Sequence, residues 1–196
     1  MSTELPIRSF ADDAAFERWL REHHAVARGV WVRFFKKGST QKSVAYAGAL
    51  DVALCFGWID SQVKKHDDAS YLQKFTPRGP KSIWSKRNRD HVARLLKEGR
   101  MHAAGLAAVD AAKRDGRWDQ AYDSPKDMEV PPDFHAALAK NAKAKKFFST
   151  LSRANLYAIG WRLQTAKKPE TRAKRIRDIV TKLARGEAFH PQKRAT

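Results

Sequence analysis

The stretch ALDVALCFGWIDSQV (residues 49–63) changes its periodicity after Gly57, and this change decides the fold. Before Gly57 the residues are apolar almost without interruption, which is typical of a buried helix, and only Asp51 breaks the run. From Trp58 onward the pattern predicts a strand. We therefore expect a central helix over residues 44–56, with Ser43 as its N-cap, that leads directly into a strand.

The predicted strand begins a β-hairpin. Residues 58–63 and 71–75 flank the turn-forming sequence HDDA at 66–69. Upstream, the β-branched and aromatic run at 30–35 predicts another strand, and residues 12–23 predict an amphipathic helix. The fold class is therefore α+β, with a small three-stranded N-terminal unit.

The remainder of the chain is mostly helical in pattern. Helices are expected near residues 86–98, 101–115, 133–140, 142–151, 153–166 and 170–185. In the helix at 153–166 apolar residues point almost all round, so we expect Leu156 and Trp161 in the core.

The segment 124–132 contains three prolines and is rich in acids, which predicts a linker. Two regions follow: an α+β unit with a basic loop and a helical extension at 1–123, and a basic helical region at 133–196. The sequence also allows the two regions to pack as one domain.

The net charge of +18 is unevenly distributed along the chain. Residues 71–118 hold 12 Lys and Arg against 4 Asp and Glu, and residues 141–196 hold 15 against 3. Such cationic blocks indicate an anionic partner, a phosphate-bearing ligand or nucleic acid bound without sequence preference. The alternative is a general compositional drift toward basic residues.

The sequence FTPRGPKSIWSKRN (75–88) combines prolines, cations and short hydroxyls. Arginine can bind phosphate or carboxylate with two parallel hydrogen bonds, and the helix N-terminus predicted at Ser85 also favours an anion. We expect one shallow anion site here, with two lysines on its rim. The candidate residues are Lys36, Lys37, Asp60, Arg78, Lys81, Ser82, Ser85, Arg87 and Asn88.

Two of these assignments have structural alternatives. Asp60 either orients the anion site or forms a salt bridge with Arg78 or Arg87 that fixes the hairpin to the loop. Trp84 is expected to pack against the protein, and the alternative is that it stacks on a base or sugar.

Other chemistry finds little support in the sequence. The seven histidines form no metal-binding motif, and no nucleotide-binding or serine-hydrolase motif is present, so we expect no catalytic residues, metal or cofactor. Cys55 is the only cysteine, which excludes an intrachain disulfide, and we expect it to be buried.

No apolar run is long enough for a membrane span, and the acidic N-terminus lacks signal-peptide features, which predicts a cytoplasmic location.

The chain resembles the YdeI/OmpD-associated, or bacteriocin-protection, family from about Trp19 to Gly186. The motifs that carry the resemblance are GVWVRFFKK (29–37), ALDVALCFGWID (49–60), FTPR (75–78), SIWSKRN (82–88), GRM (99–101), GRWDQAY (116–122) and TRAKRIRDIVTKLARGE (171–187). Ser61 stands where the family usually has glycine. The resemblance implies a role in resistance to envelope or antimicrobial stress, and it implies no particular reaction.

These observations favour a non-enzymatic protein that binds an anionic partner. Two alternatives remain open. One is an enzyme that acts on a small phosphorylated or carboxylated substrate, and the other is an adaptor for an envelope protein such as a porin. The sequence determines neither a protein partner nor the oligomeric state.

Overall fold

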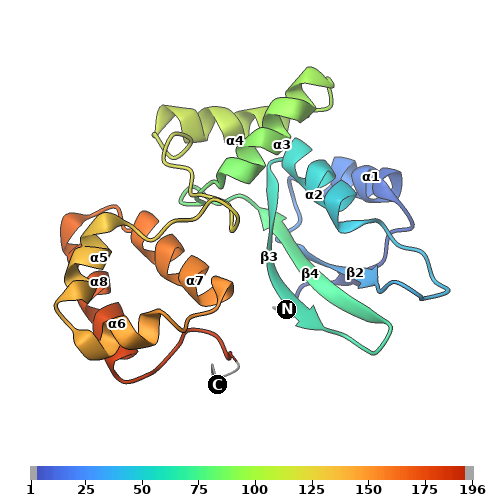
Figure 1. Cartoon of the computed structure of the whole chain (residues 1–196). Helices are drawn as coiled ribbons and strands as arrows, with labels where there is room; N and C mark the ends of the chain where they lie inside the picture. The colour runs from blue at the N-terminus through green and yellow to red at the C-terminus, as the bar shows by residue number, and fades with distance from the viewer. Residues whose placement is uncertain (1–3, 193–196) are drawn as a thin grey trace. The chain divides into compact units, whose positions relative to one another are not determined.

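The computed structural model describes residues 4–192 (Figure 1). The chain divides into two compact units, Met1–Ala121 and Tyr122–Thr196. The first unit contains β1 (Ile7–Arg8), α1 (Asp13–His23), β2 (Val30–Phe35), α2 (Tyr46–Cys55), β3 (Trp58–Lys65), β4 (Ser70–Pro77), α3 (Lys86–Lys97) and α4 (Ala103–Arg114). The second contains α5 (Pro132–Ala139), α6 (Ala142–Phe148), α7 (Arg153–Gln164) and α8 (Pro169–Ala184).

The sheet has four strands in the order β1-β2-β4-β3, one more than predicted. The additional strand is β1, whose two residues pair parallel to β2. Two residues show no periodicity, so the sequence gives no signal for this strand. The other pairings, β2 with β4 and β4 with β3, are antiparallel and confirm the predicted hairpin.

One face of the sheet packs against α1 and α2 and forms the core of the first unit. Alternation along β2 places Val30, Val32 and Phe34 on this face, and all three are buried. Phe75 on β4 contacts Phe16 on α1, with the ring centroids 5.5 Å apart. The alternation that predicts the strand therefore also selects the side chains of the core.

The α2–β3 turn requires glycine. Gly57 has a positive φ of 71°, and a Cβ at this position would lie 2.8 Å from the carbonyl oxygen of Ala104 on α4. The change of periodicity in the sequence therefore falls at a position where no side chain fits.

The predicted N-cap of α2 is wrong. The helix begins at Tyr46 with Ala45 in the cap position, where no side chain makes a capping hydrogen bond. The hydroxyl of Ser43 instead accepts a hydrogen bond from the backbone N–H of Phe35 at 3.1 Å. Ser43 therefore connects the end of β2 to the segment before the helix.

The second unit has its own apolar core. Its fully buried residues come from α5, α6, α7 and α8: Phe134, Leu138, Ala144, Ile159, Leu163, Ile179 and Leu183. Leu156 and Trp161 are only half-buried, so the prediction that they are core residues is wrong. Helix α7 does bury one side, but through Ile159 and Leu163.

The segment expected as a linker packs on α7. Met128 is buried, and a Cβ at Gly160 would lie 2.6 Å from the Cγ of Met128. The guanidinium of Arg153 donates hydrogen bonds to the carbonyl of Pro125 at 3.2 and 3.3 Å. This segment is therefore part of the second unit, because a glycine on α7 leaves space for its one large apolar side chain.

We predict that Phe134→Ala destabilises the protein strongly. Phe134 is completely buried in the core of the second unit, and removing such a ring costs about 3–5 kcal/mol. Urea unfolding followed by circular dichroism measures the change. The control is Lys140→Ala, an exposed position at the end of the same helix, which should shift stability by less than about 0.5 kcal/mol.

Candidate functional site

The connection between β4 and α3 contains several of the predicted anion-site residues. The backbone N–H of Arg78 donates to the carbonyl of Gly57 at 2.9 Å, which fixes the start of the connection to the α2–β3 turn. Ser82 closes a tight turn, because its N–H donates to the Gly79 carbonyl and its hydroxyl accepts from the Gly79 N–H at 3.1 Å. The hydroxyl of Ser82 therefore maintains the loop.

Arg78 lies flat on an indole ring. Its guanidinium carbon is 3.5 Å from the centroid of the Trp84 ring, and one of its N–H groups donates to the carbonyl of Ile83 at 3.2 Å. Trp84 is 1% exposed and contacts Trp118 edge to face. The prediction that Trp84 packs against the protein is confirmed. Arg78 covers this ring through a cation–π contact, which gives the arginine a structural role.

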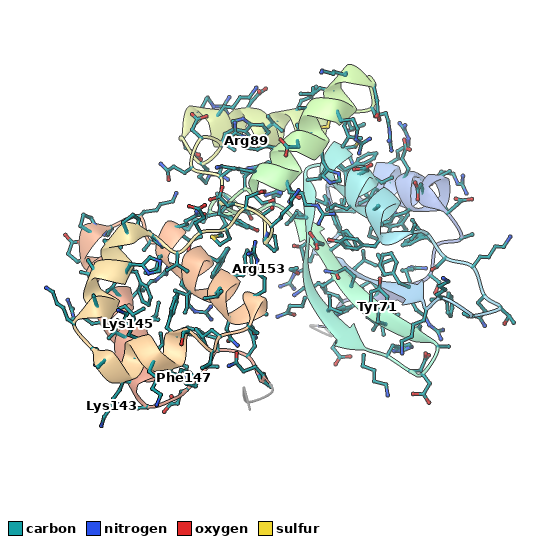
Figure 2. All side chains as sticks on the ribbon, viewed as in Figure 1. Tyr71, Arg89, Lys143, Lys145, Phe147 and Arg153 are labelled. Carbon is teal, nitrogen blue, oxygen red and sulfur yellow. The ribbon has the colours of Figure 1, made fainter. Side chains whose placement is uncertain are left out.

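Two arginines outside the predicted anion site also support this connection, one directly and one through Trp118. Arg117 donates to the carbonyl of Ser82 at 2.8 Å, and Arg89 on α3 (labelled in Figure 2) donates to the carbonyl of Trp118 at 3.0 Å. The motif GRWDQAY contains both Arg117 and Trp118. It therefore marks a support of the loop, a role that its composition does not show.

Asp60 faces α2. Its carboxylate accepts hydrogen bonds from the hydroxyl of Tyr46 at 2.8 Å and from the side chain of Gln73 at 3.4 Å. Burial raises the pKa of Tyr46, and the negative charge of Asp60 raises it further. Among residues 4–192, Asp60 forms no ion pair with Arg78 or Arg87. The structural alternative for Asp60, a salt bridge, is thus replaced by a hydrogen bond from Tyr46 on α2.

The N-terminus of α3 is formed as predicted. The hydroxyl of Ser85 accepts from the backbone N–H of Asn88 at 3.1 Å and caps the helix. Arg87 is exposed in the first turn, and its charge partly lowers the pKa of Tyr46, so it lies in the electrostatic neighbourhood of Asp60. Lys81 is also exposed.

Lys36 and Lys37 lie at the other end of the hairpin. The backbone N–H of Lys36 donates to the carbonyl of Ala69, whereas Asp60 pairs with Phe75. Six residues of strand separate these two points, which is about 20 Å at the usual rise per residue. The two lysines are therefore not on the rim of a site that contains Asp60, because β2 and β3 are not adjacent in the sheet and β2 ends beside the hairpin turn.

Asp51 is a further polar site that the sequence analysis did not select. It lies on α2 and accepts hydrogen bonds from His91 at 2.7 Å and from Arg94 at 2.5 Å, both on α3. Burial alone would raise the pKa of Asp51, but the hydrogen bonds and the charge of Arg94 outweigh this effect and lower it. The single acid within the apolar run of α2 was the signal that could have identified this interhelical contact.

The second unit exposes a group of lysines on and next to the short helix α6. Lys140, Lys143, Lys145 and Lys146 are exposed, and α6 contains no acid. Lys143 and Lys145 are labelled in Figure 2. Within the described part of the chain none of the four forms a salt bridge, so we call these four residues the lysine face.

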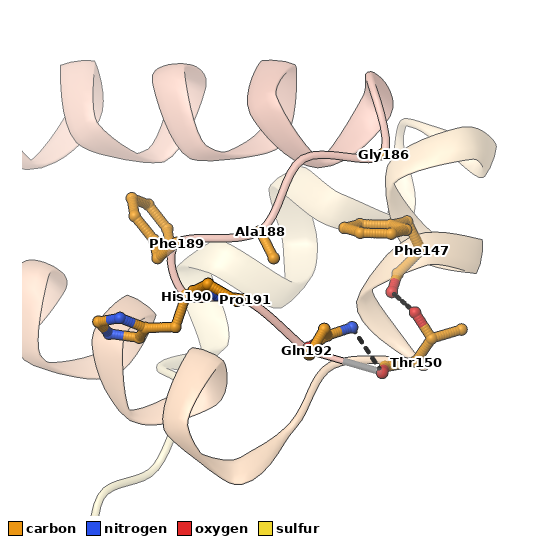
Figure 3. Close-up of a pocket in the computed structure, with 8 residues that line it drawn as sticks. All are labelled: Phe147, Thr150, Gly186, Ala188, Phe189, His190, Pro191 and Gln192. Carbon is orange, nitrogen blue, oxygen red and sulfur yellow. Dashed lines mark hydrogen bonds between the residues drawn. The ribbon is translucent and has the colours of Figure 1, made fainter. Parts of the chain in front are cut away.

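A cavity of about 550 Å³ lies beside the segment that follows α8 (Figure 3). Its lining consists of Phe147, Thr150, Gly186, Ala188, Phe189, His190, Pro191 and Gln192. The hydroxyl of Thr150 donates to the carbonyl of Phe147, and the side chain of Gln192 donates to the carbonyl of Thr150. The hydrogen bond from Gln192 therefore connects the segment after α8 to the residues that follow α6.

Residues 4–192 form neither a metal site nor a membrane-spanning helix. No group of three or more His, Cys, Asp and Glu side chains is placed to hold a metal ion. No helix in that range has the length and apolarity required to cross a membrane.

Cys55 is buried as predicted, and burial raises the pKa of its thiol to about 11, so it lacks the thiolate character of a reactive cysteine.

We predict that Arg78→Ala lowers stability. The substitution removes the cover of a buried indole, and a desolvated cation–π contact contributes about 2 kcal/mol. The control is Lys81→Ala in the same connection, where an exposed side chain is removed and the change should stay below about 0.5 kcal/mol. Equal unfolding midpoints in urea for Arg78→Ala and the parent would contradict a structural role for Arg78.

We predict that Asp51→Asn destabilises the protein by about 1–3 kcal/mol at neutral pH, because two hydrogen bonds to a charged acceptor are weakened. The pKa of Asp51 is lowered by folding, so its contribution is present above the unfolded pKa of about 3.9 and is lost as the pH falls further. Urea unfolding at a series of pH values should show the parent and variant converging in acid. Asp90→Asn, an exposed acid on α3, is the control, and a difference independent of pH would refute this assignment.

Two family models match the chain. The family described as "Domain of unknown function (DUF8412)" matches residues 8–108, which is just over half of the chain. The family described as "Bacteriocin-protection, YdeI or OmpD-Associated" matches residues 127–186. No curated protein and no solved structure matches the chain.

The motifs that carry the resemblance fall into two different family matches. Its C-terminal motif, at 171–187, lies almost entirely within the YdeI/OmpD-associated match, whereas FGWID and SIWSKRN lie within the other family. The chain belongs to the DUF8412 family, whose model covers more than half of it, and its second unit is similar to the YdeI/OmpD-associated, bacteriocin-protection family.

Proposed function

We propose that this protein binds nucleic acid through phosphate contacts, without sequence preference. The observation that supports the proposal is the lysine face: four exposed lysines on and next to one helix turn, with no carboxylate partner among the described residues. Only Ala144 of α6 is fully buried, so the lysines occupy the outer side of the helix. Lysines in this arrangement meet a phosphate backbone as point charges, and the release of counterions drives the binding.

A second contact point is the start of α3. Lys81 and Arg87 are exposed there, and the first turn of α3 contains no acid. Asn88 is half-buried beside them. This corner retains part of the anion site expected from the sequence, but Arg78, Ser82 and Ser85 are engaged in holding the loop and the helix cap. We propose it as a weaker site than the lysine face.

The biological setting of the proposal comes from the family description, which names bacteriocin protection. We propose that binding of an anionic partner serves such a protective role in this chain.

The test is a titration of the full chain with a labelled single-stranded oligonucleotide, followed by fluorescence anisotropy at about 50 and 200 mM salt. We predict binding that weakens steeply with salt. The triple variant Lys143→Gln/Lys145→Gln/Lys146→Gln should reduce the slope of log K against log salt by about 0.7 for each phosphate contact that it removes.

The matched control carries the same change in charge on the first unit. Its substitutions are Lys37→Gln/Lys42→Gln/Lys97→Gln, all at exposed positions. This control should bind nearly as the parent does. An equal loss in both triple variants would show that total charge, and not the lysine face, attracts the oligonucleotide. Absence of binding at the lower salt would refute the proposal as a whole.

A further inference from the structure

A cavity of about 350 Å³ lies in the second unit, between α7, α8 and the segment that follows α8. Part of its wall is apolar and part is charged. The lining residues are Trp161, Ile179 and Phe189, together with Arg162, Arg175, Asp178 and Lys182. Pockets for small molecules usually measure roughly 300–1,000 Å³, so this cavity has room for one small ligand.

One acid and one lysine of the wall are already paired. Asp178 accepts a hydrogen bond from Lys174 at 2.7 Å, and Lys182 forms an ion pair with Glu187 at 3.2 Å. The carboxylate of Asp178 is therefore engaged by Lys174, and Lys182 is itself a cation, so neither side chain forms an ion pair with the two arginines.

Hydrogen bonds within the protein engage only some of the N–H donors of the two arginines. Arg162 donates to the carbonyl of Ala158 at 2.8 Å, and Arg175 donates to the carbonyl of Arg162 and to the hydroxyl of Thr165. Neither arginine forms a salt bridge with any residue in the described range. A carbonyl satisfies one N–H group but leaves the positive charge in place, and each guanidinium has five N–H donors.

The proximity of the two cations is unfavourable without a counter-charge. Burial lowers the pKa of Arg162, and the charge of Arg175 lowers it further. A bound anion would offset this repulsion, and a phosphate would accept charge-assisted hydrogen bonds from both guanidinium groups.

The apolar part of the wall can hold a planar group. The guanidinium carbon of Arg162 lies 4.0 Å from the centroid of the Phe189 ring, and the ring of Trp161 is half-buried at the cavity. Aromatic and guanidinium planes are the surfaces on which nucleobases stack.

We propose that this cavity binds a small molecule that combines a phosphate group with a planar ring, the chemistry of a mononucleotide. The phosphate meets Arg162 and Arg175, and the ring packs against the aromatic wall. The site shares no residue with the lysine face, so it does not rest on the proposed binding of nucleic acid.

The experiment is isothermal titration calorimetry of the full chain with adenosine monophosphate, adenosine and inorganic phosphate. We expect adenosine monophosphate to bind at least about tenfold more tightly than either of its parts, because both halves of the wall are then occupied. Arg175→Gln should weaken binding of adenosine monophosphate by at least about tenfold, since it removes one partner of the phosphate. If Arg175→Gln does not fold, Arg175→Lys is measured, which keeps the charge and removes the planar fork.

The matched control is Arg177→Gln, which makes the same change in charge at an exposed position of α8 and should leave binding within about twofold of the parent. The triple lysine variant of α6 should retain adenosine monophosphate binding, even if it loses the oligonucleotide. No binding by the parent, or equal losses in Arg175→Gln and Arg177→Gln, would overturn the proposal. Loss of both ligands only in the triple lysine variant would assign the phosphate chemistry to the lysine face and would also overturn it.

Discussion

The close approach of backbones at residues 55–57 is the constraint on which the first unit depends. The carbonyl of Cys55 accepts the N–H of His102 at 3.0 Å, and the carbonyl of Gly57 accepts the N–H of Arg78 at 2.9 Å. The sheet, the basic connection and the start of α4 are thus all fixed to one turn. A Cβ at Gly105 would lie 2.2 Å from the Cys55 carbonyl oxygen, so α4 also needs a glycine at this contact.

This constraint gives some of the cations in the connection from β4 to α3 a structural role. Between this turn and α3 the chain buries Trp84 beneath Arg78. Arg117 then holds the carbonyl of Ser82. Arg78, which covers a buried indole, and Arg117, which binds this carbonyl, are part of the fold, because their long apolar stems and planar heads both find partners there.

The sequence predicted most of the elements, since periodicity and helix capping are local signals. Ser85 caps α3, as its position indicates. The two-residue strand β1 was missed because its pairing depends on β2 and not on its own residues. For the site, the sequence showed that cations gather at 75–88, but it did not show which of them are structural: Arg78 covers Trp84, and Trp84 is buried against Trp118, which lies far along the chain. Such contacts leave no local pattern.

The same division extends to the second unit and changes how the net charge of +18 should be interpreted. Arg153, Arg162 and Arg172 donate to backbone carbonyls, whereas the lysines of α6 extend into solvent. Arg172 also pairs with Asp133 and so carries a compensated charge. Arg162 lacks such an acid, and a carbonyl dipole cannot neutralise a full charge. The hydrogen bond to Ala158 therefore holds Arg162 in place before any ligand binds, while its positive charge has no carboxylate partner among the described residues. Preorganisation of this kind lowers the entropic cost of binding, which is why the cavity between α7 and α8 is a better candidate for a small anion than the more numerous lysines at the surface.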